Sequence, residues 1–286
     1  MPNLIDIRRR IKSVQNTQQI TRAMKFVSAA KLKRAQDRIF GARPYVKSLF
    51  KLINHIASSG NIPSHPFLEE IDSNRYLVVL ITGDKGLCGA FNANLIKAAY
   101  SFFEKNEDGE LLLDLIGKKG YEHFKKRNFE VFNYFVDRLM HVDMALAEEI
   151  ARPLIDAFLE KRIGKIFIIY NEFKSVLQQK ITIEQLLPIT SFNFDEEKEE
   201  NLNFIFDQDP SQIIEDLFPS HVKIQIYHAL LESVASEHGA RMAAMDAATK
   251  NAEEMIRQLT LFRNRVRQAS ITKEIIEIVS GANALE

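Results

Sequence analysis

Cysteine is nearly absent from this sequence: Cys88 is the only one in 286 residues. A single cysteine excludes a disulfide within the chain and cannot supply the paired cysteines of a zinc site. The seven histidines are scattered, and no two stand four apart as ligands on one helical face would. No apolar run is long enough for a signal peptide or a membrane span. We therefore expect a soluble intracellular protein with no metal and no cofactor.

An excess of one charge is also absent from the chain as a whole, because 38 basic and 38 acidic residues cancel. The balance is nevertheless uneven along the chain. Residues 1–57 hold 13 Lys and Arg against two acidic residues, a net +11, whereas residues 58–208 carry −8 and residues 209–286 carry −3. A basic first segment on an otherwise acidic chain favours an acidic partner surface, whether protein, nucleic acid or membrane.

The basic side chains of the first segment could neutralise the phosphates of a nucleic acid. Only Phe26 and Phe40 are interleaved with them, and no helix-turn-helix or other nucleic-acid module frames them. A solvated or protein-facing surface is the better interpretation, and no nucleic-acid partner is expected. The basic residues concerned are Arg8, Arg9, Arg10, Lys12, Lys25, Lys31, Lys33 and Arg34.

Residues 1–57 are expected to form one long N-terminal helix. Asn3 is a candidate N-cap, and Asp6 in the first turn complements the positive end of the helix dipole. Apolar residues recur at steps of three and four, apart from one slip. Gly41 and Pro44 interrupt this pattern and are expected to kink or loosen the helix. The apolar stripe consists of Leu4, Ile7, Ile11, Val14, Ile20, Met24, Val27, Leu32, Ala35 and Ile39.

Residues 209–286 are expected to form a second, longer helix. Asp209 and Pro210 form a helix-start signal, and apart from Pro219 no strong terminator follows before Gly281. An unbroken heptad stripe over more than three heptads is typical of a coiled-coil seam. A core helix of an ordinary bundle is the alternative, although ordinary helices average only about 11 to 12 residues. The seam consists of Met245, Ala248, Ala252, Met255, Leu259, Phe262, Val266 and Ala269.

Residues 75–195 have a different sequence pattern from the two ends of the chain, because short apolar runs alternate there with helical patterns. This alternation indicates an inserted Rossmann-like α/β domain with a mainly parallel sheet, to which the last hairpin adds an antiparallel edge. Residues 54–74 and 193–209 are expected to be linkers. The strand candidates are residues 76–82, 111–116, 130–135, 165–170 and 180–188, and the helix candidates are residues 90–104 and 143–161.

The two terminal helices are too long and their stripes too narrow for the middle domain to cover them alone. The economical solution is an antiparallel coiled coil of the two helices, with both chain ends at the same end of the pair. Roughly 55 and 70 helical residues would span about 80 and 105 Å. One stretch of the C-terminal helix must therefore run unpaired, and its last residues are apolar enough to need cover from another protein.

A glycine-rich loop, Gly83-Asp84-Lys85-Gly86-Leu87-Cys88-Gly89, follows the first strand and opens a helix. Phosphates often bind at this place in α/β proteins, so a nucleotide-binding enzyme with a coiled-coil appendage is the alternative reading. The loop matches neither G-x-G-x-x-G nor G-x-x-x-x-G-K-[ST]. We therefore favour a structural or partner-contacting turn, in which Cys88 is a small buried residue.

Small side chains crowd residues 235–252, ASEHGARMAAMDAATKNA. Gly239 in the middle of a helix costs about 1 kcal/mol relative to alanine, which suggests a packing reason for it. Close packing against the N-terminal helix and contact with a partner both remain open.

Three segments of the chain resemble the signature regions of the gamma subunit of bacterial-type F-type ATP synthases. They are IRRRIKSVQNTQQITRAMKFVSAAKLKRAQ, ITGDKGLCGAFN, and ASEHGARMAAMDAATKNAEEMI together with RQASITKEIIEIVSGANAL. Together they cover both terminal helices and the start of the middle domain. Lys85 stands where this family commonly has arginine, which keeps the charge.

The resemblance implies a central-stalk rotor without catalytic residues, at the cytoplasmic face of the bacterial inner membrane. Its partners would be the alpha and beta subunits, the epsilon subunit and the membrane c-ring. It would couple proton-driven rotation of that ring to ATP synthesis or hydrolysis. The residues implied to contact the catalytic subunits are Met24, Lys25, Arg241, Gln268 and Thr272. Those implied to approach the ring are Phe204, Phe206 and Asp207, with Phe at two positions where the family usually has Tyr.

Overall fold

The computed structural model describes residues 4–58, 65–106, 109–176, 178–189 and 210–283. The chain divides into two compact units, one formed by Met1–Ser28 with Arg241–Glu286 and the other by Ala29–Ala240. Helix α1 (Leu4–Ser58) and helix α5 (Pro210–Asn283) each contribute to both units. None of the helices in the described ranges has a stretch long and apolar enough to cross a membrane.

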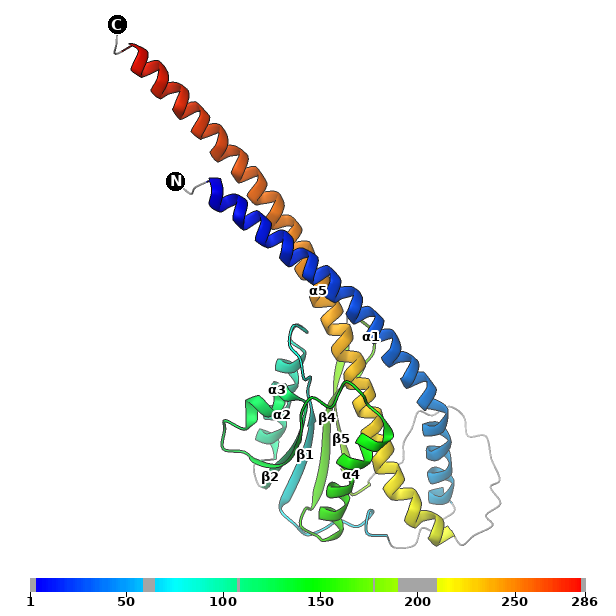
Figure 1. Ribbon diagram of the computed structural model, residues 1–286. Helices are drawn as coiled ribbons and strands as arrows, with labels where there is room; N and C mark the ends of the chain where they lie inside the picture. The colour runs from blue at the N-terminus through cyan, green and yellow to red at the C-terminus, as the bar shows by residue number, and fades with distance from the viewer. Residues whose placement is uncertain (1–3, 59–64, 107–108, 177, 190–209, 284–286) are drawn as a thin grey trace. The chain divides into compact units, whose positions relative to one another are not determined.

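The unit formed by Ala29–Ala240 is built on a five-stranded sheet of order β3-β2-β1-β4-β5 (Figure 1). The first four strands in this order are parallel, and β5 pairs with β4 in the antiparallel sense. The mixed α/β fold with a mainly parallel sheet and an antiparallel edge is therefore confirmed. The strands are β1 (Arg75–Ile81), β2 (Glu110–Ile116), β3 (Glu130–Phe135), β4 (Lys165–Phe173) and β5 (Gln179–Leu187).

One face of the sheet is covered by α2 (Phe91–Lys105) and α3 (Lys118–Phe124). Every second residue of the central strands, such as Val78 and Leu80 of β1, packs with Leu95 of α2 and Phe124 of α3. These side chains are fully buried because a parallel sheet is covered on both faces. Helix α3 was not predicted from the sequence, because its seven residues, KKGYEHF, are too few to show a helical period.

The other face of the sheet is covered by α4 (Met144–Leu159) and by the first part of α5. The Asp143 side chain caps α4 by accepting a 2.9 Å hydrogen bond from the backbone N–H of Leu146. The Phe67 ring lies 6.2 Å from that of Phe158 on α4 and 6.5 Å from that of Phe218 on α5. Together these rings form a second apolar layer beneath the sheet.

Helix α5 is also tied to the carboxyl end of β4 by polar contacts. The Glu232 carboxylate accepts a 2.9 Å hydrogen bond from the backbone N–H of Phe173, and the Ser236 hydroxyl donates to the Asn171 carbonyl at 3.1 Å. A Cβ on Gly239 would lie 3.1 Å from the Phe173 ring. The reason for a glycine here is thus the approach of strand β4, whereas packing on the N-terminal helix or on a partner had been the two alternatives.

Both terminal helices are long, with 55 residues in α1 and 74 in α5. The prediction that the C-terminal helix is the longer one is confirmed. Helix α1 stays helical through Gly41 and Pro44, where a kink or a loosening was expected. Proline removes one backbone hydrogen bond, but the fourteen residues that follow Pro44 continue the helix.

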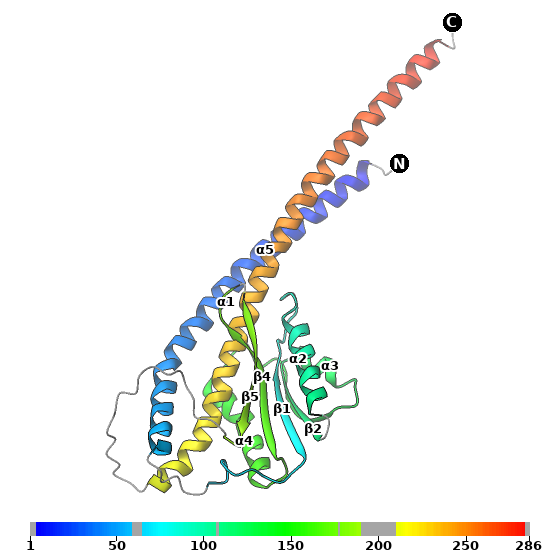
Figure 2. The same cartoon turned by 180° about the vertical axis from the view of Figure 1, so that it is seen from behind.

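In the unit formed by Met1–Ser28 and Arg241–Glu286, α1 and α5 lie side by side (Figures 1 and 2). Thr21 of α1 contacts Thr249 of α5, and one turn further along α1 Lys25 contacts Asp246, which comes earlier in α5. Residue numbers therefore rise along one helix as they fall along the other, so the pair is antiparallel. The two chain ends lie toward the same end of the pair in both views.

Candidate functional site: the paired terminal helices

Two hydroxyl groups join the helices at the centre of the pair. The Oγ1 atoms of Thr21 and Thr249 are 2.8 Å apart, and Thr249 Oγ1 also donates to the Met245 carbonyl at 2.7 Å. Thr21 is only 8% exposed, so this polar contact is shielded from water. A buried hydroxyl needs a partner of this kind, which makes the contact specific for one alignment of the two helices.

A three-residue ion cluster lies next to the threonine contact. Lys25 Nζ is 2.6 Å from one carboxylate oxygen of Asp246, and Lys250 Nζ is 2.9 Å from the other. Hydrogen bonds from Lys25 and then from Lys250 hold the pKa of Asp246 below its usual value. Lys25, which the resemblance directs toward a catalytic subunit, is therefore already engaged within the chain. The neighbouring Met24 is half-buried, and its carbonyl accepts the Ser28 hydroxyl at 2.8 Å.

The five residues implied to contact catalytic subunits fall into two groups. Arg241, only 7% exposed, lies just over one helical turn from Asp246 and thus near the level of Met24 and Lys25. Gln268 and Thr272 are exposed and lie 22 or more residues beyond Asp246 on α5. At 1.5 Å per residue the two groups are separated by about 33 Å along the helix. The residues implied by the resemblance therefore lie at two separate levels of the helix pair.

The predicted seam on α5 splits into an inward and an outward half. Met245 and Ala252 are buried, and Leu259 and Val266, each seven residues further along, are half-buried. The alternate members Met255 and Phe262 are 44% and 43% exposed, Ala269 is exposed and Ala248 is half-buried. A single partner helix covers only one side of the stripe at this length. The outward half leaves apolar surface for a second partner.

Helix α5 continues past the beginning of α1. Seventeen residues of α1 precede Thr21, whereas 34 residues of α5 follow Thr249. The difference gives α5 an overhang of about 25 Å. The C-terminal end of α5 is accordingly seen beyond the N-terminus in both views (Figures 1 and 2).

The overhang is apolar and exposed. Ile271 is 48% exposed, and four further β-branched residues are exposed by 52% to 71%. They are Ile275, Ile276, Ile278 and Val279. Large exposed apolar patches of this kind mark interaction sites. Phe204, Phe206 and Asp207, implied to approach the membrane ring, lie outside the described residues.

The glycine-rich loop is organised by the chain's own carboxylate. Asp84 Oδ1 accepts backbone N–H groups of Lys118 and Asp137 at 2.9 Å, and Oδ2 accepts that of Leu139 at 3.3 Å. An incoming phosphate would have to displace this carboxylate to use those donors. A Cβ added to Gly83 would lie only 2.9 Å from the carboxyl carbon of Glu237, so this side chain packs directly against the glycine. Two acids therefore make the carboxyl end of β1 unfavourable for an anionic nucleotide.

The same loop presents a side chain that sequence reasoning missed. Leu87 has a φ of 60° and is 65% exposed, while the adjacent Cys88 is 2% exposed. A non-glycine residue in the left-handed region costs conformational energy and often marks a functional contact. The spacing of the glycines gave no signal that the leucine between them would be exposed.

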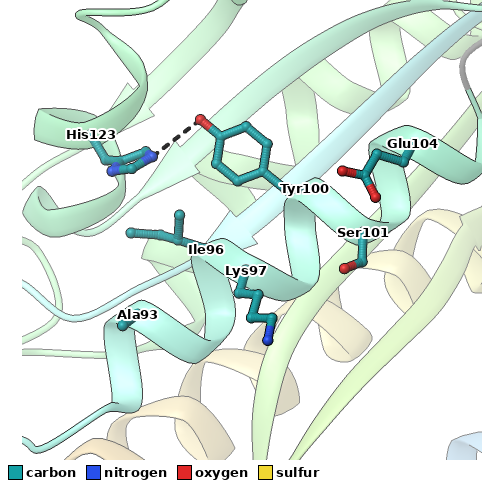
Figure 3. Close-up of a pocket in the computed structure, with 7 residues that line it drawn as sticks. All are labelled: Ala93, Ile96, Lys97, Tyr100, Ser101, Glu104 and His123. Carbon is teal, nitrogen blue, oxygen red and sulfur yellow. Dashed lines mark hydrogen bonds between the residues drawn. The ribbon is translucent and has the colours of Figure 1, made fainter.

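A shallow hollow on the outer face of α2 is the remaining candidate for a small-molecule site (Figure 3). The Tyr100 hydroxyl lies 3.2 Å from His123 Nε2. Burial, and then the charge of Arg127, lower the pKa of His123. Lys97, Ser101 and Glu104 line the same hollow, and Figure 3 shows a hydrogen bond only between Tyr100 and His123 among the residues drawn. Within the described ranges, no three His, Cys, Asp or Glu residues gather as a metal site would require.

Comparison with known proteins agrees with this architecture. The family described as ATP synthase matches residues 3–285, which places the chain in the class of ATP synthase subunits. The chain is 49% identical to the ATP synthase gamma chain of Solibacter usitatus and 45% identical to that of Geobacter sp. strain M21, with 100% of each chain covered. The chain belongs to the ATP synthase gamma chain family.

Two solved structures share the fold. A chain of the Euglena gracilis mitochondrial ATP synthase, described as OSCP/F1/c-ring in rotational state 3, superposes with a TM-score of 0.67 at 17% identity. The match covers 99% of this chain and 94% of that one. A chain of the Tetrahymena thermophila mitochondrial ATP synthase central stalk and c-ring gives a TM-score of 0.59 at 24% identity, covering 80% and 99%.

Proposed function

We propose that this chain is the central rotor of an F1Fo ATP synthase and carries no catalytic residue itself. Its α1–α5 pair stands within a ring of alternating alpha and beta subunits, and its α/β unit contacts the epsilon subunit and the membrane c-ring. The complex lies at the cytoplasmic face of the bacterial inner membrane. Proton flow turns the c-ring, and the rotor carries that rotation to the catalytic sites, where ATP is made or hydrolysed.

The observation that carries this proposal is the exposed apolar overhang of α5, together with the outward half of the seam. Both surfaces are too apolar to remain in water in a working protein, so they call for an enclosing partner. An apolar end in an apolar sleeve makes few directional bonds, and so it can turn without breaking many hydrogen bonds at each step.

The proposed coupling mechanism depends on the asymmetry of the helix pair. A pair of helices with one basic helix, one apolar stripe and two contact levels presents a different face to each of three surrounding sites. Each face contributes a different contact free energy and therefore favours a different conformation of its site. Rotation exchanges these three biases in turn. Moving one charge across the membrane supplies about 2.3 kcal/mol per 100 mV, and several such steps drive one ATP.

The absence of chemistry on the rotor is supported by the loop at the carboxyl end of β1. Asp84 places a carboxylate in the loop itself, where it accepts the backbone N–H groups of Lys118 and Asp137, and the Glu237 carboxyl group lies beside Gly83. The purified chain alone is therefore expected neither to bind nor to hydrolyse nucleotide. Equilibrium dialysis with labelled ATP tests this directly, and saturable binding would favour the nucleotide-enzyme alternative.

Reconstitution tests the rotor proposal. The chain is combined with alpha and beta subunits, and ATP hydrolysis is measured at ATP concentrations that fill several sites. Multisite hydrolysis is expected only when the chain is present, and it should fall when residues 271–286 are removed. The control is Lys97→Ala on the outer face of α2, which should leave the rate unchanged. Unaltered hydrolysis after truncation, or failure of the full chain to enter the complex, contradicts the proposal.

The implied contact residues are tested in the same assay. Gln268 and Thr272 are exposed, and Thr272 Oγ1 donates a 3.0 Å hydrogen bond to the Gln268 carbonyl. Gln268→Ala and Thr272→Ala should therefore lower multisite hydrolysis without changing the stability of the free chain. Ser280→Ala, also exposed on α5, is the matched control. Equal rates for all three variants would remove these residues from the coupling site.

A further inference from the structure

A carboxylic acid lies in the centre of the sheet. Asp114 occupies the middle of β2, where it pairs with Val79 of β1 and Asn133 of β3. Its exposed fraction is 0%. Neither carboxyl oxygen has a hydrogen-bond partner among the residues that the structure describes. Burying an ionised carboxylate in this way is far too costly for a folded domain, so the group must be accommodated differently.

Strand alternation identifies the face on which Asp114 lies. Its neighbours Leu113 and Leu115 pack with α2 and α3, so Asp114 points to the opposite face of the sheet. On that face β1 contributes Leu77, Val79 and Ile81, which are all fully buried. The opposing group on β3 is the neutral amide of Asn133, whose Oδ1 accepts the backbone N–H of Tyr134.

Among the residues that the structure describes, the helices on that face bring no cation to Asp114. The inward residues of α4 are apolar, and its charged residues Glu148, Glu149, Arg152 and Asp156 are all exposed. Glu148 and Glu149 pair instead with Lys223 and Arg138. The buried titratable groups that the structure describes on α5 are His221, Glu232, Glu237 and Arg241, of which Arg241 belongs to the other unit. Glu232 accepts the backbone N–H of Phe173, and burial lowers the pKa of His221 to about 4, so the imidazole is neutral at neutral pH. Burial alone raises the pKa of Asp114, to about 7.

We propose that the α/β unit folds with Asp114 as the neutral acid, so that folding binds a proton and the unit loosens as the pH rises. In the unfolded chain Asp114 has the ordinary aspartate pKa of about 3.9. In the folded unit burial raises its pKa to about 7, so the proton is kept to a higher pH. The stability is therefore complete below about pH 4 and is lost progressively as the pH rises to about 7. One proton released per molecule corresponds to an unfolding constant that rises about tenfold per pH unit in this window.

His221 conceals this dependence over part of the range. Because its pKa is lowered in the folded unit, its contribution is present above about pH 6.5 and is lost as the pH falls toward about 4. The two groups thus act in opposite directions between about pH 4 and 6.5. The contribution of His221 offsets that of Asp114 there, so only a difference between variants isolates Asp114.

The test measures urea unfolding of the full chain from pH 5 to 8 for the native protein and Asp114→Asn. The ratio of their unfolding constants should change by about tenfold per pH unit up to about pH 7 and then level off. Glu130→Gln, which neutralises an exposed carboxyl on the adjacent strand, should give a ratio that does not vary with pH. A constant ratio for Asp114→Asn overturns the proposal.

A second measurement needs no variant and remains decisive if Asp114→Asn fails to fold. Infrared spectroscopy distinguishes the C=O stretch of a protonated carboxylic acid from the bands of carboxylates. The native chain at pH 6 should show a protonated carboxyl band that decreases as the pH is raised through about 7, and Glu184 contributes to the same region because burial raises its pKa as well. Persistence of only carboxylate bands at pH 6 would show that Asp114 is ionised in the folded unit.

Discussion

The two units of this chain differ in how completely they bury their apolar side chains. In the unit formed by Ala29–Ala240, the strands bury whole runs of apolar side chains, and large residues such as Phe124 and Phe158 are fully enclosed. In the unit formed by the helix pair, Met245 and Ala252 are buried, but Phe262 and Ile278 face outward. The first unit carries its own core, whereas we propose that the second is completed by a partner. Stability and coupling are therefore expected to respond to different mutations.

The largest difference is expected between two phenylalanines. Phe158→Ala empties a fully buried site on α4 and should lower the free energy of unfolding by about 3 to 5 kcal/mol. Phe262→Ala removes a ring that is 43% exposed and should cost less than about 1 kcal/mol in the free chain. Urea denaturation measures both. In the reconstituted complex, Phe262→Ala should lower the rate of ATP hydrolysis more than Phe158→Ala does. Equal losses of unfolding free energy for the two variants would contradict the proposed difference between the units.

Two glycines, one in each unit, test the same difference between the units. Gly117 has a φ of +93°, and a Cβ there would lie 2.0 Å from the Thr82 carbonyl oxygen, so Gly117→Ala should cost about 3 kcal/mol. Gly281 on the overhang has nothing within 4 Å, and Gly281→Ala should stabilise the helix by about 0.5 kcal/mol. Thermal unfolding measures the first change and hydrogen exchange the second. A tolerated alanine at position 117 would contradict the described loop geometry.

A smaller effect is expected at the helix contact. Thr249→Val keeps the shape of the side chain but leaves the Thr21 hydroxyl without its partner on α5, at a cost of about 1 kcal/mol. Hydrogen exchange of the α1 amides before Ser28 should become faster, while the amides of β1 should stay protected. The Thr21 hydroxyl keeps its 3.0 Å bond to the Gln18 carbonyl in this variant, so the loss should not exceed about 1 kcal/mol. Faster exchange in β1 would argue against two independent units.

Local patterns predicted the elements well where a period is long enough to read. The apolar run at residues 76–82 identified β1, and the heptad stripe identified α5. The partners of polar side chains were not predictable, because they are distant in sequence. Asp84 bonds to residues 34 to 55 positions away, and Lys25 pairs with Asp246 across 221 positions. The seam could be drawn from the sequence, but which half faces α1 depends on how the two helices are aligned.

We propose that α1 and α5 turn as one body in the rotor. Thr21→Cys with Thr249→Cys, in a Cys88→Ala chain, places two thiols where two hydroxyl oxygens lie 2.8 Å apart, close enough for a disulfide. Multisite ATP hydrolysis by the reconstituted complex is then measured before and after oxidation. We predict the same rate in both states, because a bond within a rigid pair restrains no motion that the rotor uses. A loss of hydrolysis on oxidation that reduction restores would show that the helices must move against each other.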